Sequence, residues 1–410
     1  MNVAYLIWLE GLENPIIVGQ VIELLKELRK HVNKGKLYLI AFQPIYIFLL
    51  RRFAQNRANL KRIRFELKQN GIDLSLVPVL YPGWWFFAKW YQIPLVFIQA
   101  FPVLLHCSAV RKTKLFHCRS YPITLSAIAV KKLRNTKVIF DPRSDFPEEN
   151  VTSGRWKENS LSYKVWKSLE KIYLNNADAT IAIANTYVEH FRAISSKPNL
   201  VVIPNNVNVR KFKSDENFRR QFRAENDIKD DELLFCYCGA LGSWHKPELY
   251  AKYIIKFREL DIKHRFLFIT HQIDMLEKTL AGHGISSMEY FAIRTSFSEV
   301  PKYLSAADLG MTLLDRPKIA MAVKTPEYLS IGLPVITNSN ASGAKEVVDR
   351  NGVGLVFDLE SDLERLEEFI QGFIYQRQEL AAQCREVASR IFSNKRVGTR
   401  YAQLYTELLT

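Results

Sequence analysis

Short apolar runs alternate with longer stretches of mixed polarity along the chain. In the first half, the runs of strand length fall at residues 3–8, 37–42, 73–79, 115–118, 137–140, 178–184 and 199–203. Between the first two runs, residues 16–30 place valine and leucine at helical spacing. This alternation of strands and helices predicts a parallel, doubly wound α/β sheet.

The same pattern starts again in the second half. A buried strand begins at Leu233, and further strands are expected at 266–270, 288–292, 308–314, 335–336 and 354–357. A chain of 410 residues is too long for one typical core and suits two domains. We therefore expect one domain over 1–208, a second over 209–385 and a C-terminal helical segment over 386–410.

The charge balance narrows the class of partner. The chain has 48% apolar and 24% charged residues, which is typical of a globular protein. Its net charge of +15 favours a polyanionic partner. Zinc-knuckle, helix-turn-helix and RNA-recognition signatures are absent from the sequence, so a nucleic-acid partner is not expected. The five scattered cysteines argue against a disulfide framework, and no leader is recognisable, so we expect a cytoplasmic protein.

The segment 84–110 leaves its environment open. It starts with a Trp-Trp-Phe-Phe cluster, and residues 90–110 contain no charged side chain, a length that admits a membrane span. Two prolines, two glutamines and a histidine interrupt this stretch, so a buried or interfacial helix is an alternative. Lysine and arginine flank it at 89 and 111–114, which suits a peripheral contact with an anionic membrane. An aromatic-rich core helix is equally compatible with the pattern.

The stretch 321–337 carries the first candidate chemistry. Thr325 is expected as the N-cap of a short helix, with Pro326 at its first position and Gly332 at its end. Lys324 and Glu327 then flank a helix N-terminus, where unpaired N–H groups and the helix dipole favour an anion. The plain alternative is a capped surface helix in which Glu327 merely complements the dipole.

Other polar or glycine-rich positions directly follow predicted strands. Gly239 and Gly242 follow the strand from Leu233 and could admit a phosphate close to the backbone, with Lys246, or its neighbour His245, supplying a positive charge. In the first domain two strand ends carry polar clusters. Since ligands of open α/β sheets bind beyond the carboxyl ends of strands, these clusters are candidate functional groups: His117, Arg119, Asp141 and Arg143.

Three motifs resemble family-4 retaining glycosyltransferases of the GT-B fold. They are the Lys-x-x-Glu-Tyr-Leu-x-x-Gly-x-Pro-Val-Ile stretch from Lys324, the Ile-Pro-Asn-Asn-Val crossover at 203–207 and the Ala-Asp-x-Gly strand start at 307–310. The resemblance implies two Rossmann-like domains facing a cleft, with residues 386–410 packing back on the first domain. It places Glu327 on the ribose of a sugar nucleotide and implies further donor-binding residues: Gly239, Gly242, Lys246, Arg294, Lys324 and Thr325. It places the four polar residues of the first domain at the catalytic side.

The resemblance implies a transferase that moves a hexose-type sugar from a nucleotide sugar, with a UDP-sugar as the expected donor. The expected acceptor is a glycan or lipid-linked molecule of cell-surface polysaccharide synthesis, met at the inner face of the cell membrane. No two aspartates are separated by a single residue, so a metal-binding Asp-x-Asp motif is missing and a metal-independent, cofactor-free site is expected. Ile319 and Ala240 depart from the family pattern. They favour one alternative, a non-catalytic GT-B partner of another glycosyltransferase. A sugar-nucleotide epimerase, which can share the fold, is a second alternative.

Overall fold

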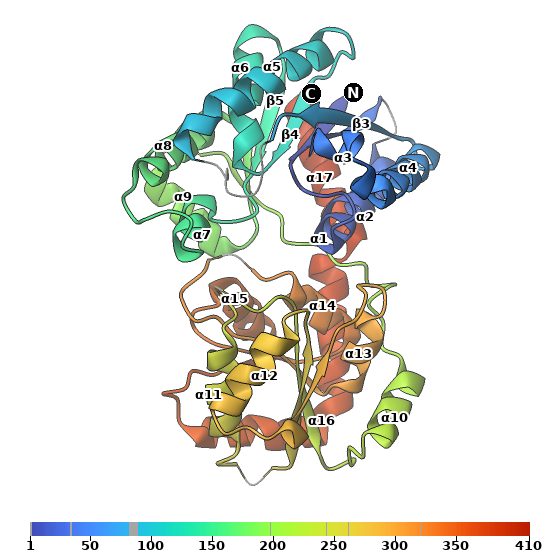
Figure 1. The fold of residues 1–410 in the computed structure, drawn as a ribbon, viewed down its shortest axis with the longest axis vertical. Coiled ribbons are helices and arrows are strands. Elements are labelled where there is room, and N and C mark those ends of the chain that lie inside the picture. The colour runs from blue at the N-terminus through green and yellow to red at the C-terminus, as the bar shows by residue number, and fades with distance from the viewer. Residues whose placement is uncertain are drawn as a thin grey trace. The chain divides into compact units, whose positions relative to one another are not determined.

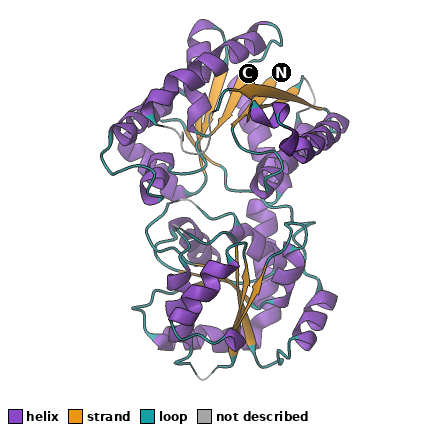
Figure 2. Cartoon of the chain, viewed as in Figure 1, coloured by secondary structure: helices purple, strands orange, loops and turns teal. Residues whose placement is uncertain are grey.

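A computed structural model describes residues 2–32, 35–81, 89–196, 198–242, 244–260, 262–319 and 321–410. The chain forms two compact units, shown in Figures 1 and 2. Unit 1 comprises Met1–Pro204 with Asn394–Thr410, and unit 2 comprises Asn205–Ser393. The division therefore lies between Pro204 and Asn205, where a boundary at 208 was expected, and the C-terminal segment of unit 1 begins at 394, where 386 was expected.

Unit 1 is built on a seven-stranded sheet in the order β3-β2-β1-β4-β5-β6-β7, and every neighbouring pair is parallel. The strands are β1 Val3–Trp8, β2 Leu37–Pro44, β3 Ile72–Val79, β4 Leu115–Arg119, β5 Lys137–Asp141, β6 Ala179–Ala182 and β7 Leu200–Val202. The predicted doubly wound sheet is confirmed. The strand order reverses between β1 and β4, the point at which such sheets bind ligands beyond their carboxyl ends.

Helices cover both faces of this sheet. They are α1 Pro15–Ile17, α2 Glu23–His31, α3 Tyr46–Leu49, α4 Ala54–Gln69, α5 Ile93–Ala109, α6 Tyr121–Leu133, α7 Phe146–Thr152, α8 Leu161–Asn176, α9 Asn185–Ile194 and α17 Asn394–Leu409. A π-helical turn at Val18–Ile22 joins α1 to α2, so the helix expected over 16–30 is not regular throughout.

The C-terminal helix α17 is part of unit 1. It packs against α2, and Val397, Tyr401 and Tyr405 lie fully buried in the same core as β1 and β2. Gly398 lies at this contact, where a Cβ would come within 3.2 Å of Glu27 Cγ. The red helix beside α2 in Figure 1 shows this arrangement.

Helix α5 is an outer-layer helix with an unusual exposed side. It packs against α6 through Ala100, Leu104 and Cys107, which are buried. Among the described residues, Trp90–Ala109 is the one helical segment long and apolar enough to cross a membrane by length and composition, and 22% of its most apolar window is buried. A core helix is therefore the wrong interpretation of this segment. The cluster at 84–87 lies outside the described residues.

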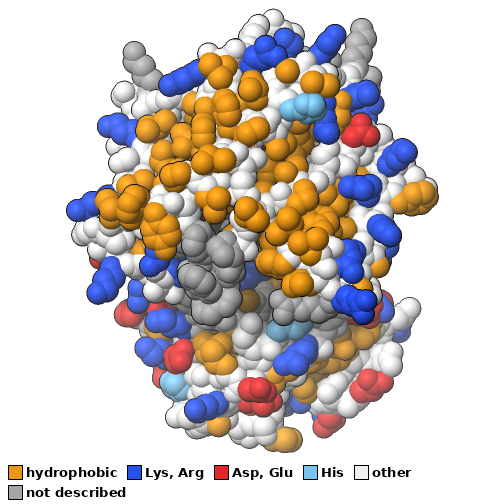
Figure 3. All heavy atoms as spheres, turned by 45° about the horizontal axis from the view of Figure 1, so that its top comes forward, with side chains coloured by type: hydrophobic (Ala, Val, Ile, Leu, Met, Phe, Trp, Pro, Cys, Tyr) orange, Lys and Arg blue, Asp and Glu red, His pale blue; other side chains and the backbone are white. Residues whose placement is uncertain are grey.

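The exposed side of α5 belongs to an apolar surface. An exposed stripe runs along the helix at i, i+4 spacing: Pro94, Ile98, Pro102 and His106. Lys89 lies exposed before the helix, and Lys112 and Lys114 lie exposed after it. Figure 3 shows hydrophobic side chains gathered over unit 1 with Lys and Arg side chains around them.

Unit 2 has a six-stranded parallel sheet in the order β10-β9-β8-β11-β12-β13. Its strands are β8 Leu233–Cys238, β9 His264–Ile269, β10 Tyr290–Ile293, β11 Leu309–Thr312, β12 Val335–Thr337 and β13 Gly354–Val356. Its helices are α10 Glu216–Glu225, α11 Pro247–Phe257, α12 Ile273–Gly282, α13 Val300–Ala306, α14 Lys324–Ile331, α15 Ser342–Asn351 and α16 Leu363–Val387. The strand order reverses between β8 and β11, so the carboxyl ends of these two strands mark the switch point of unit 2.

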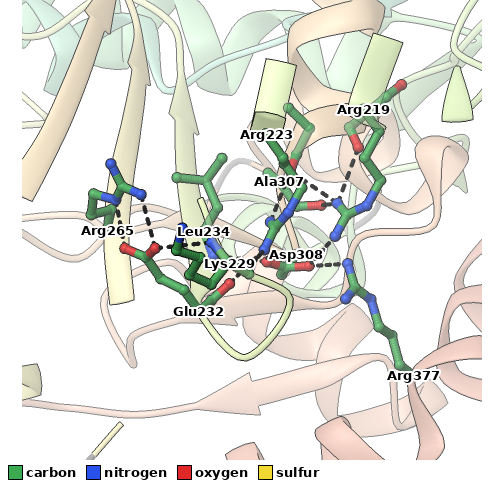
Figure 4. A network of polar contacts seen from close by, with 11 residues as sticks. Arg219, Arg223, Lys229, Glu232, Leu234, Arg265, Ala307, Asp308 and Arg377 are labelled. Atoms are coloured by element: carbon green, nitrogen blue, oxygen red, sulfur yellow. Dashed lines mark hydrogen bonds and ion pairs between the residues drawn. The ribbon is translucent and has the colours of Figure 1, made fainter. Parts of the chain in front are cut away.

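A buried ion network fixes the start of β11. The carboxylate of Asp308 accepts from Arg219 Nη2 at 2.7 Å, from Arg223 Nη1 at 3.1 Å and from the backbone N–H of Leu234 at 2.8 Å. Arg377 of α16 pairs with the same carboxylate (Figure 4). Burial raises the pKa of Asp308, and the guanidinium groups of Arg219 and Arg223 oppose that shift. One carboxylate thus ties α10, α16 and β8 together.

We predict that Asp308→Ala destabilises unit 2 strongly. Removing one partner from a buried ion network leaves uncompensated charge and costs about 3–5 kcal/mol of the free energy of unfolding, measured by urea titration. Asp231→Ala is the matched control, since Asp231 and its partner Lys263 are both exposed, and it should change stability little. Equal effects of the two substitutions would contradict the role given to Asp308.

Candidate functional site

Helix α14 is held in place by its own buried side chains. The Tyr328 hydroxyl accepts the backbone N–H of Cys238 at 2.7 Å, and its ring fills the space where a Cβ at Gly310 would lie, 2.5 Å away. On the far side, Ser330 Oγ donates to the Phe212 carbonyl at 2.7 Å. Glu327 is the one side chain of α14 that is not buried, so this carboxylate is the natural contact for a ligand.

The start of α14 differs from the expected cap. The helix begins at Lys324, with Val323 in the cap position and without a side-chain cap. Thr325 is fully buried, and its Oγ1 has no hydrogen-bond partner among the described residues. The predicted N-cap role of Thr325 is therefore wrong, and its donor-binding role stays a prediction. The predicted stop is confirmed, since Gly332 ends the helix with φ of 98°.

The Lys324 ammonium lies in a preformed niche. Its Nζ is 3.0 Å from His245 Nε2 and 4.1 Å from the centroid of the Tyr237 ring. His245 Nδ1 lies 2.8 Å from the Leu313 carbonyl, so Nδ1–H donates there and Nε2 is left to accept from Lys324. The predicted Lys246 has a different partner: its ammonium pairs with Asp315 at 2.7 Å. Of the two neighbours, His245 is therefore the one beside Lys324.

Burial sets the protonation of this niche. It lowers the pKa of Lys324 to about 7 and raises the pKa of Glu327 to about 8. Burial, reinforced by the charge of Lys324, holds the pKa of His245 well below its usual range, so this imidazole is neutral. A lysine with so little compensating negative charge favours the arrival of an anion.

The two glycines of the loop after β8 have backbone partners and leave room for Lys324. The N–H of Gly239 donates to the Ile269 carbonyl at 2.9 Å, and the N–H of Gly242 donates to the His245 carbonyl at 3.0 Å. These two amides are therefore occupied, and the close approach of a phosphate to the loop stays a prediction. Gly239 has φ of 141°, and a Cβ there would meet Lys324 Nζ at 3.1 Å, so any side chain would displace the ammonium.

Arg294 lies at the same edge of the sheet. It follows β10, is exposed, and its Nη2 donates to the His271 carbonyl at 3.0 Å. Sequence reasoning missed Tyr237 and Tyr328, which shape the niche around Lys324 and α14. Tyr328 directly follows Glu327 in the recognised motif, whereas nothing in the sequence around Tyr237 indicates its contact with Lys324.

The four polar residues of unit 1 do come together, but two of them are inaccessible. His117 and Asp141 are fully buried, with His117 Nε2 2.9 Å from Asp141 Oδ2 and His117 Nδ1 2.6 Å from the Tyr405 hydroxyl. Arg143 donates through Nε to the same Asp141 oxygen at 2.9 Å and through Nη2 to the Tyr401 hydroxyl at 2.8 Å. The cluster thus anchors α17, and His117 and Asp141 cannot touch a substrate in this arrangement.

The electrostatics of this cluster fit an anchoring role. Burial alone would raise the pKa of Asp141, but Arg143 and His117 hold it below its usual range. Burial lowers the pKa of His117, so the imidazole is neutral at physiological pH. Arg119 pairs through Nε with Glu10, 3.1 Å away, and the Glu10 side chain is 33% exposed. Glu10, which sequence reasoning missed, is the part of the cluster that reaches the surface, at the carboxyl end of β1.

The chain thus consists of two parallel α/β units, and Lys324 and Glu327 lie at the switch point of the second. A family profile described as "Glycosyl transferase 4-like domain" matches residues 47–206, and one described as "Glycosyl transferases group 1" matches residues 218–390. The matches span most of both units. The chain belongs to the family-4 type of GT-B glycosyltransferases and uses a nucleotide sugar as donor.

Solved structures share this fold. A glycosyltransferase from Rickettsia africae superposes with a TM-score of 0.70 at 14% identity, covering 100% of this chain and 98% of that one. Anabaena HepE in complex with UDP superposes with a TM-score of 0.69 at 13% identity, covering 99% of this chain and 100% of that one. Sucrose-phosphate synthase from Thermosynechococcus elongatus superposes with a TM-score of 0.71 at 14% identity, covering 100% of this chain and 99% of that one. No curated protein sequence matches the chain.

We predict that Lys324→Met stabilises unit 2 while removing its anion site. The pKa of Lys324 is about 7 in the fold, against about 10.4 in an unfolded chain, so the fold disfavours its charged form. That penalty is fully present below pH 7 and disappears above pH 10.4. The gain should therefore be largest near pH 6 and shrink as pH rises. Each kcal/mol gained raises the thermal midpoint by roughly 2–4 °C in a unit of this size.

Thermal unfolding followed at pH 6 and pH 9 measures this effect. Lys252→Met, on an exposed position of α11, is the control and should leave the midpoint unchanged at both values. A lower midpoint for Lys324→Met at pH 6 would show that Lys324 is not strained by its burial.

Proposed function

We propose that this protein is a retaining glycosyltransferase that moves a hexose-type sugar from a UDP-sugar to a lipid-linked or glycan acceptor of cell-surface polysaccharide synthesis. The observation that carries the donor part is that a buried lysine, Lys324, and the one side chain that is not buried, Glu327, lie in the first turn of the same helix. HepE, which shares the fold, binds UDP and UDP-glucose. This likeness supports a uridine nucleotide as the donor carrier.

The donor would be held by groups with separate tasks. The Lys324 ammonium meets the diphosphate, next to the N-terminus of α14, which adds a favourable dipole. The Glu327 carboxylate accepts from the ribose hydroxyls. Arg294, exposed at the same edge of the sheet, contacts the nucleobase side. His245 accepts from Lys324 and keeps the ammonium in position.

Charge neutralisation by Lys324 is the central catalytic contribution in this proposal. Breaking the bond between sugar and diphosphate leaves negative charge on the departing UDP, and a preorganised cation stabilises that charge as it develops. The anion in turn raises the fraction of Lys324 that is protonated, since burial lowers the pKa of the free site to about 7. We propose that this lysine fills the role of a metal ion, because the sequence lacks an Asp-x-Asp pair.

Unit 1 would serve the acceptor. We assign His117, Asp141 and Arg143 a positioning role, because their contacts are to one another and to α17. The Arg119–Glu10 pair, at the switch point of the sheet, is the part of the cluster that meets the acceptor. The exposed stripe of α5 and the net charge of +15 support attachment to the inner face of the cell membrane as a peripheral protein.

We predict that Glu327→Ala weakens UDP binding and sugar transfer. Burial raises the pKa of Glu327 to about 8, so the carboxyl group is ionised at pH 9. At that pH its hydrogen bonds contribute about 1.5–3 kcal/mol, which corresponds to roughly a 10- to 100-fold loss of affinity. Calorimetry with UDP measures the first effect, and transfer of radiolabelled glucose from UDP-glucose to a bacterial lipid extract measures the second.

Glu368→Ala is the control for this experiment. It removes an exposed carboxylate from α16 and should leave both affinity and transfer unchanged. Wild-type affinity and transfer in Glu327→Ala would overturn the role assigned to Glu327.

A further inference from the structure

A cavity of about 210 Å³ lies in unit 1 at the carboxyl ends of β1, β3 and β4. Its wall is mostly apolar and includes Trp8, Leu9, Leu80, Ile93, Val96 and Trp166. Leu80 is 61% exposed, so the cavity reaches the surface at this side chain. Polar groups enter the wall at Glu10 and Ser120, just after β1 and β4, and at Tyr81, Gln92 and Gln99. The buried Gln92 Nε2 has no hydrogen-bond partner among the described residues.

The polar side chain of Gln99 in this wall is already occupied. Its Oε1 accepts the backbone N–H of Leu80 at 2.5 Å, and its Nε2 donates to the Leu95 carbonyl at 3.1 Å. Gln99 therefore links α5 to the end of β3 rather than offering a free amide to a ligand. The Glu10 carboxylate is likewise paired with Arg119. An apolar ligand suits such a wall better than one rich in hydroxyl groups.

The volume of the cavity restricts the class of ligand further. Pockets that hold a whole drug-sized molecule measure roughly 300–1,000 Å³, and this cavity is smaller. An α-helix with side chains is about 10–12 Å across, so a docked helix could place only single side chains into a cavity of about 210 Å³. A flexible hydrocarbon chain, entered lengthwise, fits both the volume and the apolar wall.

Helix α5 connects the cavity to the apolar surface of unit 1. Ile93, Leu95 and Val96 line the cavity, while Pro94 and Ile98 belong to the exposed stripe of the same helix. The exposed lysines before and after α5, Lys89, Lys112 and Lys114, complement anionic lipid headgroups. A helix with this exposed apolar side and basic ends lies at a membrane interface, where lipid chains are available at the mouth of the cavity.

We propose that this cavity binds a hydrocarbon chain of a membrane-borne lipid acceptor. The chain enters from the surface formed by α5 and Leu80, and the polar end of the acceptor comes to lie near Glu10 and Ser120. This proposal rests on the proposed function, because it supposes that unit 1 serves the acceptor. It adds the chemical class of that acceptor and the residues that recognise it.

Photolabelling of the full chain tests the proposal. The probe is farnesyl phosphate with a diazirine at the end of its chain, carried in vesicles of equal parts phosphatidylglycerol and phosphatidylethanolamine. Peptide mass spectrometry should place the label on cavity residues of α5 and α8, such as Val96 and Trp166. Val96→Phe, which fills the cavity, should lower this labelling at least tenfold. Val96→Ala, which enlarges it, should retain the labelling.

A second variant guards against misfolding of the first. Leu80→Glu places a charge at an exposed position of the cavity mouth, so the fold should tolerate it, and cavity labelling should again fall at least tenfold. Label found only on the exposed stripe around Ile98, or cavity labelling that Val96→Phe and Leu80→Glu leave unchanged, would overturn the proposal.

Calorimetry with UDP on the same preparations separates this proposal from the proposed function. UDP binding without label in the cavity would overturn the lipid-chain site alone. Label in the cavity without UDP binding would overturn the proposed donor function alone.

Discussion

The burial of α14 is the constraint on which the donor site depends. Tyr328 and Ser330 hold the helix against β8 and the segment at Phe212, and this packing leaves Glu327 half-exposed. The same packing carries the Lys324 ammonium past Gly239 to His245 and Tyr237. An ammonium group that is buried without full compensation stabilises the fold poorly and binds an anion well, which is a frequent compromise at functional sites.

The polar cluster of unit 1 follows the opposite principle. His117, Asp141 and Arg143 are buried among partners that bond to them, and two tyrosines of α17 complete the set. Such a network makes a unique arrangement and holds distant segments together. The Arg119–Glu10 pair lies at the switch point of the same sheet, and Glu10 lines the apolar cavity. We propose that the network positions this pair. In the proposed function, buried charge serves ligand capture in unit 2 and alignment in unit 1.

The sequence predicted the features that depend on local pattern. Apolar runs separated by amphipathic stretches identified both parallel sheets, and Gly332 before Leu-Pro marked the end of α14, because only a residue that tolerates positive φ fits there. The start of α14 was missed because tertiary packing overrode the capping signal of Thr325. His117 and Tyr405 lie 288 residues apart, so no local pattern could reveal their bond. Whether His245 or Lys246 lies beside Lys324 depends on the conformation of the loop between β8 and α11, which residue spacing alone cannot predict.

Hydrogen exchange of the full chain, with and without UDP, tests the donor site most directly. Backbone amides at an anion-binding helix N-terminus become protected when the ligand binds, and the response can be located by peptide mass spectrometry. The account predicts protection in the peptides that contain the start of α14 and the loop after β8, around Lys324 and Gly239. Binding of UDP without protection in either peptide, or protection confined to unit 1, would contradict it.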